Sequence, residues 1–178
     1  YLAGYRNVIE PYLNRGIGNY VFLWGQKQER TPTWYGLLTE AGETTEAVDV
    51  MSYIWNGRWP DNRAPVVLNV TLNNRAPTDS IRLAPGTRYT ARAQVVDPEE
   101  DALAFRWSIK PESESESHGG DFEEEPADLN GLTVIGDNGS VTLRTPDEPG
   151  PYRLFFYAAD PHNQAAHGNI PFYVTAPD

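Results

Sequence analysis

The sequence predicts a mainly β protein, in which a sandwich of about seven strands follows a short α/β segment. Residues 1–62 combine helical spacing with short apolar runs, whereas residues 63–178 alternate apolar and polar side chains with a period of two. Turns rich in Pro, Gly and Asp separate the alternating runs, which is the pattern of a sandwich. A Pro-containing stretch at residues 59–65 divides the two parts as a linker.

The first 62 residues are expected to form a helix, a buried strand and a second helix. Apolar side chains at helical spacing predict a helix over residues 5–13. The almost uniformly apolar run at residues 19–24 is typical of a strand buried on both faces of a parallel sheet. Thr44 or Thr45 is expected to cap a second helix. The stripe that this helix buries comprises Ala47, Val48, Met51, Ile54 and Trp55.

The remaining residues supply the sandwich strands. The seven predicted runs lie at residues 66–72, 80–83, 89–95, 102–109, 140–143, 152–157 and 170–174. An acidic, Ser-rich insertion at residues 112–128 interrupts them, and charge of one sign at this density predicts a solvated loop.

Composition limits the classes of function. The chain of 178 residues carries 25 acidic against 14 basic residues, a net charge of −11, which excludes nucleic acid as a partner. The absence of cysteine excludes disulfides and thiolate chemistry. No run approaches the roughly 20 apolar residues that span a bilayer, so we expect no membrane insertion. The chain begins at Tyr1 without a basic leader, and any export signal is expected upstream.

One group of side chains has the chemistry of a metal site. Asp97, Glu99, Asp101 and Asp160 fall in two loops that follow the third and sixth of the predicted runs. Hard carboxylate oxygens gathered at one end of a sandwich suit Ca²⁺, which is the one cofactor that the sequence suggests. The alternative is that Asp97 and Pro98 begin a turn that Asp101 closes, with no metal involved.

Two motifs in the sandwich carry a family resemblance. The stretch V-V-D-P-E-E-D-A-L-A-F-R-W at residues 95–107 and the stretch P-G-P-Y-R-L-F-F-Y-A-A-D at residues 149–160 resemble bacterial PKD-type and cadherin-like immunoglobulin-fold modules. The resemblance spans residues 64–176 and implies an immunoglobulin-like sandwich. Trp107 would then fill the centre between the sheets, and Tyr152 would form a tyrosine corner. Such motifs indicate a fold and say little about function.

The first part resembles a different family. Residues 18–38, which contain Y-V-F-L-W-G and W-Y-G-L-L, followed by G-E-T-T-E-A-V-D-V-M at residues 42–51, are similar to the last strand and helix of a retaining glycoside hydrolase barrel. The resemblance implies that Trp24 floors the sugar subsite, with Glu29 and Trp34 nearby. It also implies that both catalytic carboxylates lie upstream, so no catalytic residue is expected in this chain. Alternatively, both Trp side chains belong to a core and Glu29 lies on the surface.

These resemblances imply a non-catalytic C-terminal fragment of a secreted, periplasmic or cell-surface glycoside hydrolase. The sandwich would be a structural accessory or spacer module beside an upstream catalytic barrel, and carbohydrate would bind through the parent enzyme. One alternative is a carbohydrate-binding module, for which Phe122, Tyr157 and Tyr173 are the candidate aromatic side chains. Another is an adhesion or interaction module stiffened by calcium, in the manner of cadherins.

Overall fold

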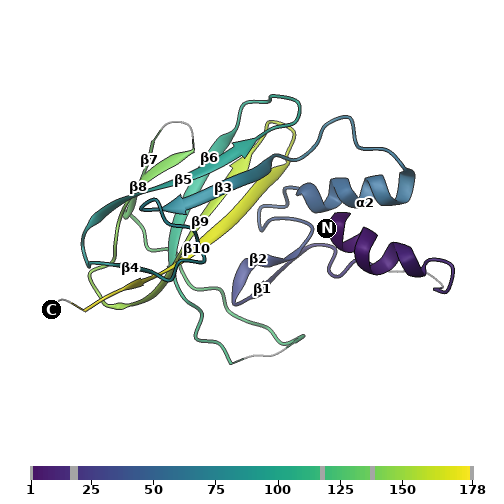
Figure 1. Cartoon of the computed structure of the whole chain (residues 1–178). Coiled ribbons are helices and arrows are strands. Elements are labelled where there is room, and N and C mark those ends of the chain that lie inside the picture. The colour runs from purple at the N-terminus through teal and green to yellow at the C-terminus, as the bar shows by residue number, and fades with distance from the viewer. Residues whose placement is uncertain (1, 17–19, 117–118, 137–138, 177–178) are drawn as a thin grey trace.

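The protein is a sandwich of two four-stranded sheets, with the helices and a two-stranded hairpin gathered beside it (Figure 1). The structure is a computed structural model that describes residues 2–16, 20–116, 119–136 and 139–176. The predicted fold class, mainly β with a sandwich, is confirmed. None of the helices in these described ranges is long and apolar enough to cross a membrane.

The two sheets follow from the predicted runs. One has the order β4 (Ile81–Leu83), β10 (Ala165–Val174), β9 (Gly150–Ala159) and β6 (Ala104–Pro111). The other has the order β3 (Val66–Leu72), β5 (Arg88–Val96), β8 (Ser140–Arg144) and β7 (Thr133–Ile135). Every neighbouring pair is antiparallel except β4 with β10. Each predicted run holds one strand, and β7 is the additional one.

The core lies between the two sheets, as period-two alternation requires. Trp107 is 7% exposed and its ring packs at 5.2 Å from that of Phe156, which confirms its central place. The Tyr152 hydroxyl donates to Glu148 O over 3.0 Å, so the predicted tyrosine corner is present as well. The fully buried side chains of this core include Leu72, Ile109, Leu143, Leu154, Phe156, Ile170 and Val174.

Helical turns and a hairpin make up the N-terminal part. The turns are α1 (Leu2–Gly4), a π-helical turn (Tyr5–Ile9) and a 3₁₀ turn (Glu10–Tyr12), and the hairpin pairs β1 (Gln26–Glu29) with β2 (Thr31–Gly36). Helix α2 (Glu46–Asn56) begins after Thr45, whose hydroxyl accepts from Ala47 N as predicted. Its buried face packs on Leu37 in a small cluster with Ala47, Val50 and Met51. Trp55, which was predicted to belong to the buried stripe, is 56% exposed because it lies in the last turn, beyond this cluster.

The prediction of a buried strand at residues 19–24 is wrong. Residues 20–24 form no strand, and Tyr20, Phe22 and Trp24 are 101%, 69% and 63% exposed; Asn19 lies outside the described residues. Leu23 has a φ of 63°, which interrupts an extended conformation. A strand buried on both faces needs hydrogen-bonded neighbours at both edges. None of the described strands pairs with residues 20–24.

The residues around α2 are bound to the sheet that contains β6, β9 and β10. Thr44 N donates to Asn163 O (3.1 Å), and Ala165 N donates to Thr44 O (2.8 Å). Arg106 of β6 donates through both Nη atoms to the buried Glu43 carboxylate, at 2.7 and 2.8 Å. These hydrogen bonds from Arg106 lower the pKa of Glu43. The N-terminal part is therefore held against one face of the sandwich.

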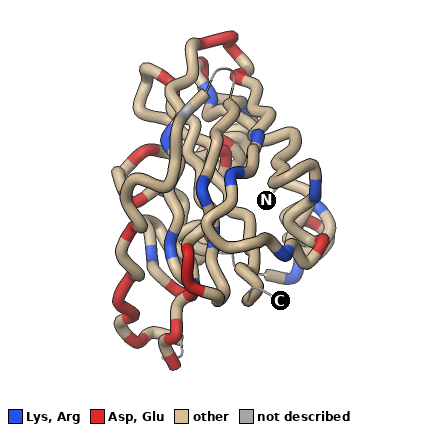
Figure 2. The backbone as a smooth tube through the Cα atoms, turned by 90° about the vertical axis from the view of Figure 1, so that its left-hand side faces the viewer, with Lys and Arg blue, Asp and Glu red and all other residues tan. Residues whose placement is uncertain are grey.

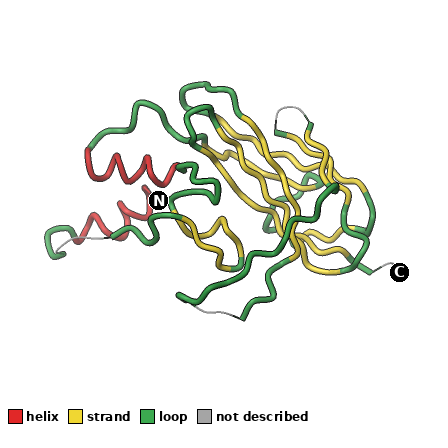
Figure 3. The backbone as a smooth tube through the Cα atoms, turned by 180° about the vertical axis from the view of Figure 1, so that it is seen from behind, coloured by secondary structure: helices red, strands yellow, loops and turns green. Residues whose placement is uncertain are grey.

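The acidic insertion is only partly the solvated loop that its composition predicts. It runs beside the β1–β2 hairpin (Figure 3), where Arg30 N donates to Glu123 Oε1 and Oε2 at 3.0 and 3.1 Å. Glu123 is 6% exposed. Glu112 accepts from Arg153 of β9 (2.7 Å), and Glu125 is paired with Lys110 of β6. Cationic side chains of β6 and β9 and a backbone amide of the hairpin thus stabilise these carboxylates. Without such partners, repulsion between the carboxylates would favour a solvated loop.

Candidate functional site

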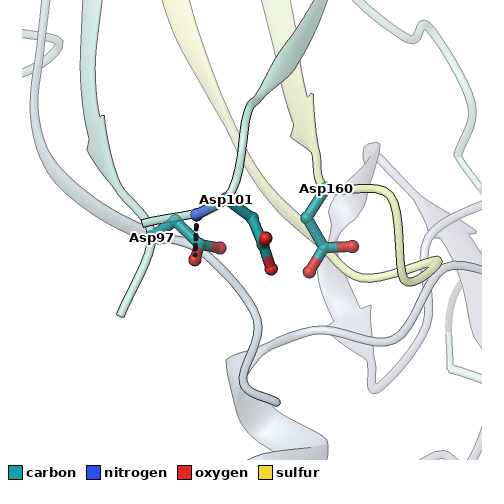
Figure 4. Close-up of side chains that lie close together, drawn as sticks. All are labelled: Asp97, Asp101 and Asp160. Atoms are coloured by element: carbon teal, nitrogen blue, oxygen red, sulfur yellow. Dashed lines mark hydrogen bonds between the residues drawn. The ribbon is translucent and has the colours of Figure 1, made fainter. Parts of the chain in front are cut away.

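Three carboxylates meet at the end of the sandwich where the N-terminal part is attached (Figure 4). Asp97 and Asp101 lie in the turn after β5, and Asp160 directly follows β9. One oxygen of each lies within 4.8 Å of the others. The sequence placed both loops at the same end, and the structure brings these three predicted residues together.

Asp97 organises its own turn. Its Oδ1 accepts from Glu99 N (3.0 Å) and Asp101 N (2.9 Å), while Glu100 takes a left-handed φ of 66°. This arrangement is the turn that the alternative interpretation anticipated. Its Oδ2, however, is buried and has no hydrogen-bond partner within the described parts of the chain. A buried carboxylate oxygen without a donor is costly, so turn formation alone does not account for both oxygens.

Asp160 closes the opposite loop and is 8% exposed. Its Oδ1 accepts from His162 N (2.8 Å) and Gln164 N (2.9 Å), and its Oδ2 accepts from Asn62 Nδ2 (3.2 Å). Asp101 is linked to the same loop through His162 Nε2, 3.5 Å from its Oδ2. Asp160 is thus fixed in place by the linker and by its own loop.

Glu99, the fourth predicted ligand, lies outside the cluster. Its carboxylate binds Arg63 of the linker, accepting from Arg63 N (3.0 Å) and Arg63 Nε (3.3 Å). Three carboxylates are therefore available for a divalent cation. Because Ca²⁺ takes six to eight oxygens, backbone carbonyls, side-chain amides such as that of Asn62, and water would complete its shell.

The three predicted sugar-binding residues are not assembled into one subsite. Trp24 is exposed before β1, Glu29 binds Lys27 Nζ (2.9 Å), and Trp34 is 52% exposed on β2. The Arg153 guanidinium lies 6.0 Å from the centre of the Trp34 ring, so that Trp faces the sandwich. No hydrogen bond, ion pair or ring contact joins these three residues in the part of the chain that the structure describes.

The aromatic side chains considered for a carbohydrate-binding module are also dispersed. Phe122 is 89% exposed in the acidic insertion. Tyr173 of β10 is 42% exposed beneath the Arg82 guanidinium, and Tyr157 of β9 packs against Arg106 and His167. Burial, the largest cause, raises the pKa of Tyr157.

One polar pocket was not predicted from the sequence. It has a volume of about 300 Å³ and is lined by Glu40, Arg106, Lys110, Asp128 and Tyr157, among others. Burial first, and then the nearby Glu125 carboxylate, raise the pKa of Glu40 to about 7. Four separate segments contribute these groups, and no local sequence motif indicates that they meet.

Comparison with known proteins finds remote structural similarity and no family. No protein-family model and no curated protein matches the chain. Among solved structures, a Saccharophagus degradans protein described as nucleoside hydrolase-related and associated with carbohydrate metabolism is 20% identical over 64% of this chain, with a TM-score of 0.39. This chain spans 26% of that protein.

Two further structures are similar at the same level. The PKD domain of an M14-like peptidase from a Thermoplasmatales archaeon is 20% identical, covering 65% of this chain and 99% of that domain, with a TM-score of 0.38. Extracellular domains of Drosophila OTK are 10% identical over 65% of this chain and 33% of that one, also with a TM-score of 0.38. A glycoside hydrolase barrel segment does not emerge from these comparisons.

Proposed function

We propose that this chain is a non-catalytic accessory part of a secreted carbohydrate-active enzyme, with its sandwich serving as a structural module beside an upstream catalytic barrel. The attachment of the N-terminal part to the sandwich is the observation that carries the proposal. Glu43 and Thr44 hold that part against β6 and β10, so it is suited to transmit a fixed orientation from whatever precedes it. A flexible tether would need none of these contacts.

The surface of the N-terminal part supports the same role. Tyr20, Phe22 and Trp24 are exposed in succession, and the Phe22 ring contacts that of Tyr35 at 5.5 Å. Exposed aromatic clusters of this kind are characteristic of surfaces that another domain covers. In the proposed arrangement the catalytic barrel packs there.

The two carboxylates considered for catalysis in the N-terminal part, Glu10 and Glu29, are also consistent with a non-catalytic role. Glycoside hydrolysis requires two carboxylates on opposite sides of the scissile bond. Glu29 is bound to Lys27, and Glu10 lies in a 3₁₀ turn rather than at the end of a strand. Neither is paired with a second carboxylate across a cleft among the described residues.

The test is an assay of the purified chain on aryl glycosides and on a panel of neutral and charged polysaccharides. No release of sugar is expected. Turnover that disappears in Glu29→Gln or Glu10→Gln would overturn the proposal, because the chain would then contain catalytic machinery of its own.

A second candidate function is favoured by the unpartnered Oδ2 of Asp97. A Ca²⁺ ion held by Asp97, Asp101 and Asp160 would crosslink the turn after β5, the loop after β9 and, through Asn62, the linker. The sandwich would then be a calcium-stiffened module, whose junction with the preceding part the ion makes more rigid.

A further inference from the structure

Two adjoining hollows lie along strands β3 and β5, and the larger one extends to Leu103, directly before β6, and to Phe105 of β6 in the other sheet. The larger, about 740 Å³, is lined by residues that include Asn69, Thr71, Arg92 and Gln94, and also by the Gly136 and Gly139 backbone of the β7–β8 hairpin. The smaller, about 240 Å³, includes Asn73, Asn74, Arg88 and Thr90. Thr71 and Arg92 line both, so the hollows form one groove along β3 and β5.

The charge in this groove is of one sign. Arg88 and Arg92 are four residues apart on β5, so their side chains lie on the same face, about 13 Å from each other along the strand. Both are exposed, and neither has an ion pair or a hydrogen bond within the described residues. The described residues that line the two hollows include no Asp or Glu.

The other sheet is arranged differently. Arg106 is paired with Glu43, Lys110 with Glu125 and Arg153 with Glu112, so the cations of β6 and β9 are neutralised by segments that lie over them. In a chain with 25 acidic and only 14 basic residues, an acidic partner for an exposed arginine is readily available. Figure 2 shows Asp and Glu mainly in loops at the edge of the view and several Lys and Arg positions nearer its centre.

Unpaired arginines on a sheet of an otherwise acidic protein suit an anionic ligand, because guanidinium groups bind carboxylates through paired hydrogen bonds. The groove also contains amide and hydroxyl side chains, which both donate to and accept from sugar hydroxyl groups, and an apolar wall that includes Val95, Leu103 and Phe105. The groove is open and elongated, so a chain fits it better than a compact ion. We propose that the groove along β3 and β5 binds an acidic polysaccharide, with Arg88 and Arg92 contacting its carboxylates.

This proposal goes beyond the structural role of the module and does not depend on it. An acidic protein segment would satisfy the two arginines as well, but it would meet Asn69, Thr71, Asn73 and Gln94 with one backbone donor and one acceptor per residue, whereas a sugar unit offers several hydroxyl groups. A polyhydroxylated chain uses both sets of groups. The net charge of −11 disfavours anion binding to the surface as a whole, so a specific anion site needs local unpaired cations such as Arg88 and Arg92.

The experiment is isothermal titration of the whole chain with three probes of matched length: an oligogalacturonate, a neutral malto-oligosaccharide and an oligoglutamate. We expect the oligogalacturonate to bind most tightly and its affinity to fall as salt is raised. The Arg88→Gln/Arg92→Gln variant should bind it at least tenfold more weakly. An Arg58→Gln/Arg82→Gln variant is the matched control, because both double variants change the net charge from −11 to −13 by replacing two exposed arginines.

The outcomes separate the alternatives. Loss of affinity in the Arg88/Arg92 variant with full affinity in the control supports the proposal, provided that both variants melt as the parent does. An equal loss of affinity in both variants would mean that net charge alone explains the effect, and it would overturn the proposal. Oligoglutamate binding as tight as that of oligogalacturonate would identify the groove as a protein-docking surface, and no binding of any probe would also overturn it.

Discussion

Replacing Asp49 by Asn should remove a pH-dependent component of stability that the structure assigns to one buried carboxyl group. Asp49 lies in the first turn of α2 and is 2% exposed. Its Oδ2 accepts from Ala64 N of the linker (2.7 Å), but its Oδ1 is buried without a hydrogen-bond partner among the described residues. Burial raises the pKa of Asp49 from 3.8 to about 6, despite the opposing effect of the Ala64 hydrogen bond.

A raised pKa means that the folded protein binds this proton more tightly than the unfolded chain does. The resulting stabilisation is complete below the unfolded value of 3.8 and is lost as pH rises through about 6. Between pH 7.5 and pH 5 the carboxyl group should therefore add about 1.4 kcal/mol to the free energy of unfolding. Asn keeps an oxygen for Ala64 N and carries no charge, so its contribution should not vary with pH.

The assay is urea denaturation at several pH values across that window. Because the pKa of Glu40, at about 7, lies in the same range, the informative quantity is the difference between the parent and Asp49→Asn, which cancels the contribution of Glu40. The free energy of unfolding of the parent minus that of the variant should increase by about 1.4 kcal/mol from pH 7.5 to pH 5. Glu46→Gln, an exposed acid in the same turn, is the control. A difference that stays constant with pH would refute the reasoning.

The remaining predictions concern the core and the acidic cluster. Trp107→Ala should lower the free energy of unfolding by about 3–5 kcal/mol, whereas Trp55→Ala, which truncates an exposed ring, should cost less than about 1 kcal/mol. Equal losses in the two variants would contradict the assigned core. Calcium at about 5 mM should stabilise the parent by about 1–2 kcal/mol relative to chelator, given the roughly 10⁻⁴–10⁻³ M affinities of extracellular modules. Asp101→Asn should abolish this gain, and a parent melt that is unaffected by calcium would leave Asp97, Asp101 and Asp160 as turn formers.

The sandwich could be predicted because its signals are local. Alternation with a period of two fixes which side chains face the core, and Trp107 and Tyr152 occupy the places that their motifs imply. The position of the acidic cluster also followed, because the turn after β5 and the loop after β9 emerge at the same end of the sandwich. What the pattern could not give was the orientation of Glu99, which depends on Arg63 of the linker.

The run at residues 20–24 shows where the reasoning failed. Five apolar or aromatic residues in a row fit a buried strand, but apolar composition does not supply the hydrogen-bonded neighbours that such a strand requires. The structure instead begins its first strand at Gln26, in a hairpin whose strands pair only with each other. Trp24 therefore remains exposed, and Trp34 meets Arg153 rather than a sugar-binding residue.

The distribution of charge explains why the two sheets differ. None of the eight sandwich strands contains Asp or Glu, so every acid that pairs with a strand cation must come from another segment. Glu43 comes from the N-terminal part, and Glu112 and Glu125 come from the acidic insertion. Both segments lie over the sheet that contains β6 and β9. The insertion therefore stabilises the N-terminal part through Arg30 and neutralises one sheet at the same time, while Arg88 and Arg92 on the other sheet stay available to a ligand.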